Sequence, residues 1–136
     1  MAKFFQKILT IGALFFLITP SYGQEMREEV GVYLLKKSPD GSSSYIDLRD
    51  LQKVGPIRRF WSVIYYGKPV DGIIHQLSSY IEIDCSSVTL SYRGSASYDK
   101  NGNSVDTDFD PSIVLNKQPI VPNSVGDVMR KMVCVL

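Results

Sequence analysis

The stretch that decides the fold is Val88-Thr-Leu-Ser-Tyr-Arg-Gly-Ser-Ala-Ser-Tyr98. Apolar or small residues alternate with polar ones along its whole length. Successive side chains of a β-strand point to opposite faces of the sheet, so a period of two residues predicts a strand with one face toward a core. We therefore expect a sheet to be the basis of the fold, and the neighbouring segments follow the same pattern.

The chain turns immediately after this strand. The segment from Asp99 to Asn103 contains Asn101-Gly102, the pair that favours a tight hairpin because both residues tolerate positive φ. A final strand is expected from Ser104 to Phe109. On the other side, Leu77 to Cys85 also alternates and precedes a turn at Ser86-Ser87. Consecutive strands joined by short turns predict an antiparallel sheet.

Earlier segments supply further strands. The polar stretch Arg49 to Gly55 is expected to be a loop or helical turn, and Gly67-Lys68-Pro69 is expected to end the strand before it. Ser38 to Gly41 carries the composition of a turn. The expected strands are Val30 to Lys37, Tyr45 to Leu48, and Ile57 to Tyr66.

The last part of the chain changes to the period of a helix. Asn123 or Ser124 can cap its start, and Asp127 follows Ser124 at the spacing of a capping box. Arg130 and Lys131 fall near the negative end of the helix dipole. An apolar stripe with helical spacing predicts packing on the sheet. The stripe consists of Val125, Val128, Met129 and Met132.

Residues 1–23 have the three parts of a secretory signal peptide. Two lysines and no acid precede the apolar run from Ile8 to Ile18, and small residues lead up to Gly23. A stable membrane anchor needs about 20 apolar residues, so this run is too short. We expect cleavage after Gly23, a mature domain of residues 24–136, and residence in the periplasm or at the cell surface. The alternatives are an uncleaved anchor and a buried N-terminal helix.

Cys85 and Cys134 are the only cysteines of the chain. An even count in an exported protein predicts one disulfide. Cys85 ends a strand on its inward face and Cys134 directly follows the helix, so the bond would staple one to the other. The alternative, a redox or nucleophilic thiol, lacks a C-x-x-C motif and a histidine nearby in sequence. The predicted fold is α+β: one antiparallel sheet of about six strands, a C-terminal α-helix packed on one face, and one disulfide.

Charge excludes some functions. The predicted mature chain has 13 basic and 14 acidic side chains, a net charge of −1. Nucleic-acid binding depends on clustered positive charge, so we expect no nucleic-acid partner. No second apolar run is long enough to span a membrane after signal cleavage.

Four segments between Tyr45 and Cys134 form a set with a characteristic order and spacing. They are Tyr45-Ile46-Asp47-Leu48, the tryptophan-centred strand Arg59 to Tyr66, the pair Asp84-Cys85, and Pro122 to Asp127 leading to Val133-Cys134. Together they resemble the surface-adhesin protein E family of Gram-negative bacteria. The resemblance implies an α+β domain that adheres to host extracellular-matrix proteins.

Catalytic and metal-binding patterns are weak. His75 is the only histidine, so it is expected to be solvated or hydrogen-bonded. The spacing Asp99-x-Asn101-x-Asn103 begins like a calcium loop, but Ser104 replaces the required glycine and Asp110 the usual glutamate. We interpret this stretch as a hairpin and expect no metal, cofactor or catalytic residue. Asp106, Asp108 and Asp110 would share one face and mark a solvated strand edge.

Arg58, Arg59 and Lys53, with Lys36-Lys37, can gather into a basic patch for a partner; scattered surface charges explain them equally well. The sequence therefore favours an exported, non-catalytic domain that binds a host-matrix or envelope protein, and leaves a homodimer open. The first alternative is a structural or stress-related protein of the periplasmic envelope without an adhesive role. A periplasmic enzyme is less favoured, because no nucleophile–base pair is present.

Overall fold

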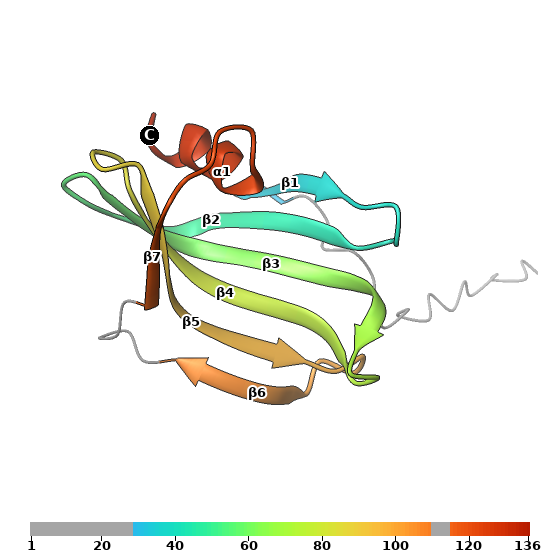
Figure 1. Cartoon of the computed structure of the whole chain (residues 1–136). Coiled ribbons are helices and arrows are strands. Elements are labelled where there is room, and N and C mark those ends of the chain that lie inside the picture. Colours follow the sequence, from blue (N-terminus) through green and yellow to red (C-terminus); the bar gives the residue numbers. More distant parts are fainter. Residues whose placement is uncertain (1–28, 110–114) are drawn as a thin grey trace, which may run out of the picture.

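Six strands follow one another across an antiparallel sheet in the order in which they occur in the chain (Figure 1). The computed structural model describes residues 29–109 and 115–136, so the predicted signal peptide and Asp110 lie outside the described residues. The elements are β1 (Val32–Lys37), β2 (Ser43–Val54), β3 (Ile57–Val70), β4 (Ile74–Asp84), β5 (Thr89–Tyr98), β6 (Ser104–Phe109), β7 (Leu115–Pro119) and α1 (Val125–Val133).

The sheet and helix confirm the predicted α+β fold. One strand, β7, was not expected, because its sequence contains neither β-branched residues nor alternation. It pairs with the first half of β5, whereas β6 pairs with the second half, so both strands occupy the same edge of β5. Pairing with β5, rather than the propensity of its own residues, therefore holds β7 extended.

Two predicted strand ends were wrong. β2 continues to Val54, through the stretch expected to be a loop, because its polar end pairs with the beginning of β3. β3 continues through Gly67-Lys68-Pro69 to Val70. A Cβ atom at Gly67 would lie 2.0 Å from the carbonyl oxygen of Asp40. This glycine therefore permits a close approach of the β1–β2 turn, and it does not end the strand.

The core lies between α1 and one face of the sheet, which we call the helix face; the opposite face is the outer face. Met129 and Val133 of α1 are buried there, and Met132 packs partly against them. The predicted stripe was wrong at Val128, which is exposed, whereas Val125 faces the sheet but is only partly covered. The buried core cluster consists of Ile46, Phe60, Ile81, Ile83, Met129 and Val133.

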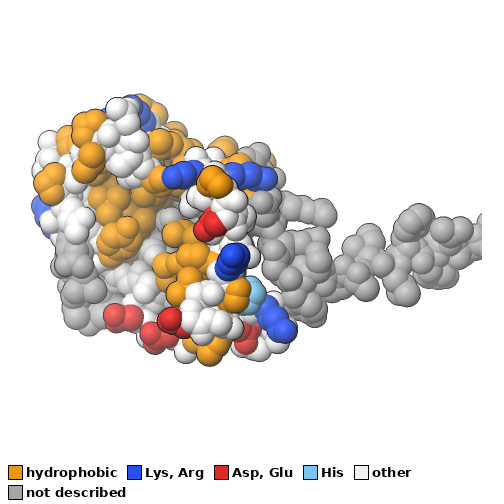
Figure 2. Space-filling model, turned by 45° about the vertical axis from the view of Figure 1, so that its right-hand side comes forward, with side chains coloured by type: hydrophobic (Ala, Val, Ile, Leu, Met, Phe, Trp, Pro, Cys, Tyr) orange, Lys and Arg blue, Asp and Glu red, His pale blue; other side chains and the backbone are white. Residues whose placement is uncertain are grey.

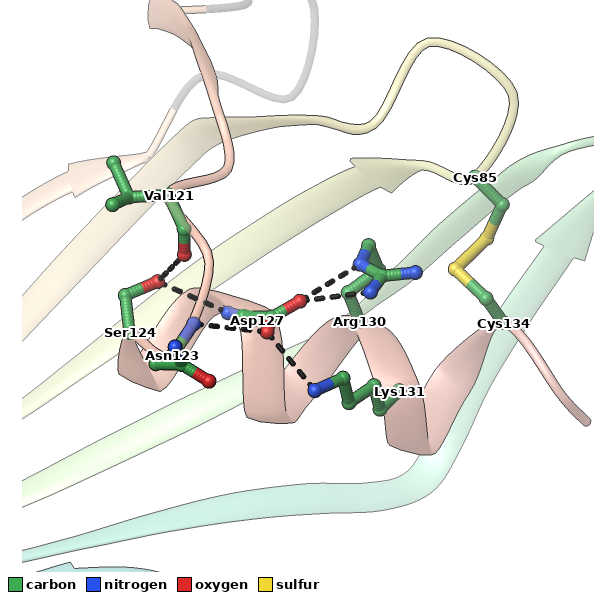
Figure 3. Close-up of polar contacts among 8 residues, drawn as sticks. All are labelled: Cys85, Val121, Asn123, Ser124, Asp127, Arg130, Lys131 and Cys134. Carbon is green, nitrogen blue, oxygen red and sulfur yellow. Dashed lines mark hydrogen bonds and ion pairs between the residues drawn. A yellow bond between two sulfur atoms is a disulfide. The ribbon is translucent and has the colours of Figure 1, made fainter.

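The disulfide and the helix cap fix the position of α1 (Figure 3). Cys85 and Cys134 are bonded, as predicted, with their Cα atoms 5.7 Å apart. Ser124 is the N-cap, and its Oγ accepts a hydrogen bond from the backbone N–H of Asp127 at 3.2 Å. The carboxylate of Asp127 in turn accepts the backbone N–H of Asn123 and binds Arg130.

The regular alternation of the deciding stretch is interrupted once. Tyr80 pairs with Gly94 and Ile81 pairs with Tyr92, so Arg93 is an extra residue in β5. This β-bulge exchanges the faces of all later residues. Gly94, Ala96 and Tyr98, expected to continue the face of Leu90 and Tyr92, lie on the outer face instead, and Ser95 and Ser97 lie on the helix face.

Candidate functional site

A pocket of about 530 Å³ lies between the first half of α1 and the helix face. Val125, Gly126 and Met129 form its wall on α1. Figure 2 shows hydrophobic side chains gathered in and around a hollow, with acidic side chains below it. The sheet residues that line the pocket are Ser44, Ser62, Ile64, Leu77, Ser79, Ile81, Leu90, Tyr92, Gly94, Ser95 and Asp108.

The hollow exists because α1 is short and part of the sheet surface below it is small. α1 has nine residues, about 13 Å of helix, whereas β3 has 14 residues and extends well beyond it. Ser62, Ser79 and Ser95 lie on the part of the helix face that α1 does not fill, and their side chains are too small to fill it. The pocket could not be predicted from the sequence, because its lining by Ser95 depends on the bulge at Arg93.

The structure brings together two of the three predicted basic residues. Lys53 and Arg58 are direct partners on β2 and β3, so they share a face, whereas Arg59 lies on the other. The Arg58 guanidinium donates to the carbonyl oxygens of Gly55 and Val133, which ties the β2–β3 turn to the end of α1. Arg58 therefore helps to hold the end of α1 in place, in addition to placing a positive charge there.

Arg59 belongs to an ionic cluster on the outer face. Its Nε donates to Glu82 at 2.8 Å, and Arg93, the bulge residue, binds the same carboxylate oxygen. Burial alone would raise the pKa of Glu82, but the hydrogen bonds from Arg59 and Arg93 outweigh it and hold that pKa below its ordinary value. This cluster fastens β3, β4 and β5 to one another.

The hairpin interpretation of the calcium-like segment is confirmed. The carboxylate of Asp99 accepts the backbone N–H groups of Asn101 and Asn103 at 2.8 and 2.9 Å, inside the β5–β6 turn. Gly102 has positive φ and Asn101 does not, so the turn is longer than the two-residue type. Within residues 29–109 and 115–136, no three His, Cys, Asp or Glu side chains are grouped as metal ligands would be. His75 lies in β4, half-buried.

Comparison with known proteins supplies the family. The family model described as surface-adhesin protein E matches residues 32–135. The chain belongs to the surface-adhesin protein E family. No curated protein and no solved structure matches it. Among the described residues of this adhesin E domain, no helix has the length and hydropathy needed to cross a membrane.

One further surface of the adhesin E domain combines basic side chains with exposed apolar ones. Arg58 donates to the main-chain oxygen of Leu136, so the end of the chain lies against the β2–β3 hairpin. Val135 is 81% exposed and Leu136 is 53% exposed at this end of the chain. We call this the helix-end surface, and it consists of Lys53, Arg58, Val135 and Leu136.

Proposed function

We propose that this adhesin E domain is exported, remains at the cell surface or in the periplasm, and acts by binding another protein without catalysis. The observation that carries the proposal is the family match, which spans nearly all of the described residues. The disulfide supports the compartment, because such bonds persist in oxidising environments outside the cytoplasm. The predicted signal peptide of residues 1–23 supports it independently.

The helix-end surface is the contact site that we propose for the partner. Exposed aliphatic side chains next to basic ones suit a protein segment that presents apolar residues and carboxylates. Lys53 is exposed at this surface, and Arg58 is held beside it by main-chain oxygens. Arg59 lies on the opposite face, so its predicted role in partner binding would require a second contact area and stays a separate prediction.

Surface plasmon resonance with the protein purified after export tests the proposal. The panel contains extracellular-matrix proteins and proteins of the bacterial envelope at micromolar concentration. Lys53→Glu should weaken binding several-fold and reduce its dependence on salt. Lys100→Glu is the matched control, because Lys100 lies in the β5–β6 turn at the opposite end of the strands.

Cell fractionation, together with protease treatment of intact cells, distinguishes an adhesin from a structural protein of the periplasmic envelope. An adhesin must be accessible to a protease added outside the cell. Purely periplasmic protein that binds nothing in the panel would overturn the adhesive function and favour a structural role in the envelope. Binding that is equally sensitive to Lys53→Glu and Lys100→Glu would overturn the helix-end surface as the contact site, but not the function itself.

A further inference from the structure

A row of polar side chains crosses the floor of the pocket. Ser62 on β3 pairs directly with Ser79 on β4, Ser79 pairs with Ser95 on β5, and Ser95 pairs with Asp108 on β6. All four residues line the pocket. We call them the serine row. It runs perpendicular to the strands and ends at a carboxylate on the edge of the sheet.

Apolar side chains flank the serine row on both sides. Toward α1, Ile81 and Tyr92 form the neighbouring row, and Met129 closes the pocket from the helix. Away from α1, Ile64 pairs with Leu77 to form the next row. A ligand in this pocket would therefore contact hydrocarbon along its sides and hydroxyl groups beneath it.

Two hydroxyl groups of the serine row are available to a ligand. Ser62 is 9% exposed and Ser79 is 6% exposed, and within the described part of the chain neither side chain makes a hydrogen bond. By contrast, the neighbouring Ser97 hydroxyl donates to the main-chain oxygen of Asp106. The hydroxyl oxygens of Ser62 and Ser79 are not fully buried, so water or a ligand in the pocket can serve as their hydrogen-bond partner. Here the groups face the pocket.

The end of the serine row at Asp108 favours a positively charged group of a ligand. Asp108 is exposed and forms no ion pair with the described residues, whereas Glu82 and Asp127 are both paired with arginine. Asp106 lies two residues away on the same face of β6. The Asp108 carboxylate at this rim repels an anionic ligand and attracts a cationic one.

We propose that the pocket binds a small amphiphilic cation, with an apolar body between the helix and the sheet, hydrogen-bonding groups on the serine row, and an ammonium group at Asp108. A volume of about 530 Å³ is within the usual range for small-molecule sites. Apolar walls with a few convergent polar groups are also typical of such sites. This ligand is independent of the protein partner proposed above.

Isothermal titration calorimetry with three probes of equal chain length tests the charge preference. The probes are decylammonium, decan-1-ol and decanoate, each below its micelle concentration, titrated into the protein purified after export. Decylammonium should bind one per chain and at least about fivefold more tightly than decan-1-ol, with decanoate the weakest. Absence of decylammonium binding at millimolar concentration, or equal binding of decanoate, would overturn the proposal.

Variants locate the site. Asp108→Asn should reduce decylammonium binding to the level of decan-1-ol. The matched control Asp106→Asn makes the same change on the same face, outside the pocket lining, and should keep most of the preference. Ser79→Leu should fill the pocket and abolish binding of all three probes. Ser95→Leu repeats this test should Ser79→Leu fail to fold. Binding that survives a folded pocket-filling variant, or a preference that survives Asp108→Asn, would contradict the proposal.

Discussion

At the scale of single residues, the start of α1 shows how local chemistry positions an element. Ser124 accepts the backbone N–H of Asp127 and donates its own hydroxyl to the carbonyl oxygen of Val121 at 2.6 Å. The N–H groups of the first helical turn have no partners within the helix, so such a cap stabilises its start. In a helix of nine residues, one cap is a large share of the local stability.

Ser124→Ala should therefore destabilise the protein by about 1 kcal/mol, the usual cost of losing an N-cap. Thermal unfolding followed by circular dichroism should show a decrease in Tm of about 4 °C for a domain of this size. Ser87→Ala, in the exposed β4–β5 turn, is a control with the same chemical change. An unchanged Tm for Ser124→Ala would show that the disulfide and core alone position the helix.

The carboxylate of Asp127 makes stability depend on acid pH. Its hydrogen bond from the Asn123 backbone, followed by those from Arg130 and Lys131, lowers its pKa to about 2. The unfolded chain, with the ordinary pKa of 3.8, takes up the proton first as the pH falls. This contribution is therefore complete above about pH 5 and is lost progressively toward pH 2.

Asp127→Asn should lower Tm at pH 7 and should also flatten the decrease in Tm between about pH 5 and pH 2. The measurement is a series of thermal melts over that range. Asp106→Asn removes an exposed carboxylate outside the helix cap, so the decrease in Tm toward low pH should stay close to that of the unmodified protein. If Asp127→Asn and the unmodified protein showed the same decrease in Tm, Asp127 would not be the source of the acid dependence.

The structure gives Gly67 a different role from the predicted one. It was expected to end β3, but it lies where the β1–β2 turn crosses the strand. Gly67→Ala should place a methyl group against the backbone at Asp40 and Gly41, which cannot move without opening the turn. We expect a loss of about 1–3 kcal/mol in urea unfolding. Gly55→Ala gives a comparison at a site where positive φ, rather than a clash, is the obstacle.

At the scale of elements, the disulfide joins α1 to the end of β4. The bonded cysteines are 49 residues apart, and closing a loop of that length stabilises the protein by about 4 kcal/mol at most in the chain-entropy model. Arg58 adds a second link, from β3 to the carbonyl oxygen at the end of the helix. The C-terminal end of α1 is thus held twice, and its N-terminal half, which lines the pocket, is held by the cap.

Cys134→Ala together with Cys85→Ala should lower Tm by more than about 8 °C. The double substitution avoids a free thiol that could form bonds between molecules. Non-reduced peptide mapping of the unmodified protein should recover the Cys85–Cys134 linkage. A Tm within about 2 °C of the unmodified protein would mean that Arg58 and the core hold the helix without the bond.

At the scale of the whole molecule, the predicted signal peptide determines where the mature chain begins. If it is removed after Gly23, N-terminal sequencing of the exported protein should read Gln24-Glu25-Met26. The mature chain then has a net charge of −1. Retention of residues 1–23 on a membrane-bound protein would contradict cleavage and revive the anchor interpretation.

Sequence and structure agree most closely where local signals are strong. Ser104 to Phe109 was predicted with its exact bounds, because a glycine-containing turn and regular alternation define it. The capped helix and the cysteine pair were also predicted correctly. The candidate partner residues could be named from the sequence, but their division between two faces required the register of β2 against β3.

The sequence by itself therefore determined the presence of β1 to β6, the helix and the cross-link, because periodicity, turn chemistry and cysteine placement act over a few residues. It did not determine β7, which pairing with β5 holds extended. Only the tertiary structure decided which side chains meet. The bulge at Arg93 turns Ser95 toward the helix face and aligns it with Ser62 and Ser79. A bulge arises from the pairing of one strand with its neighbour, here with Glu82 holding the extra arginine, and no period within β5 alone predicts it.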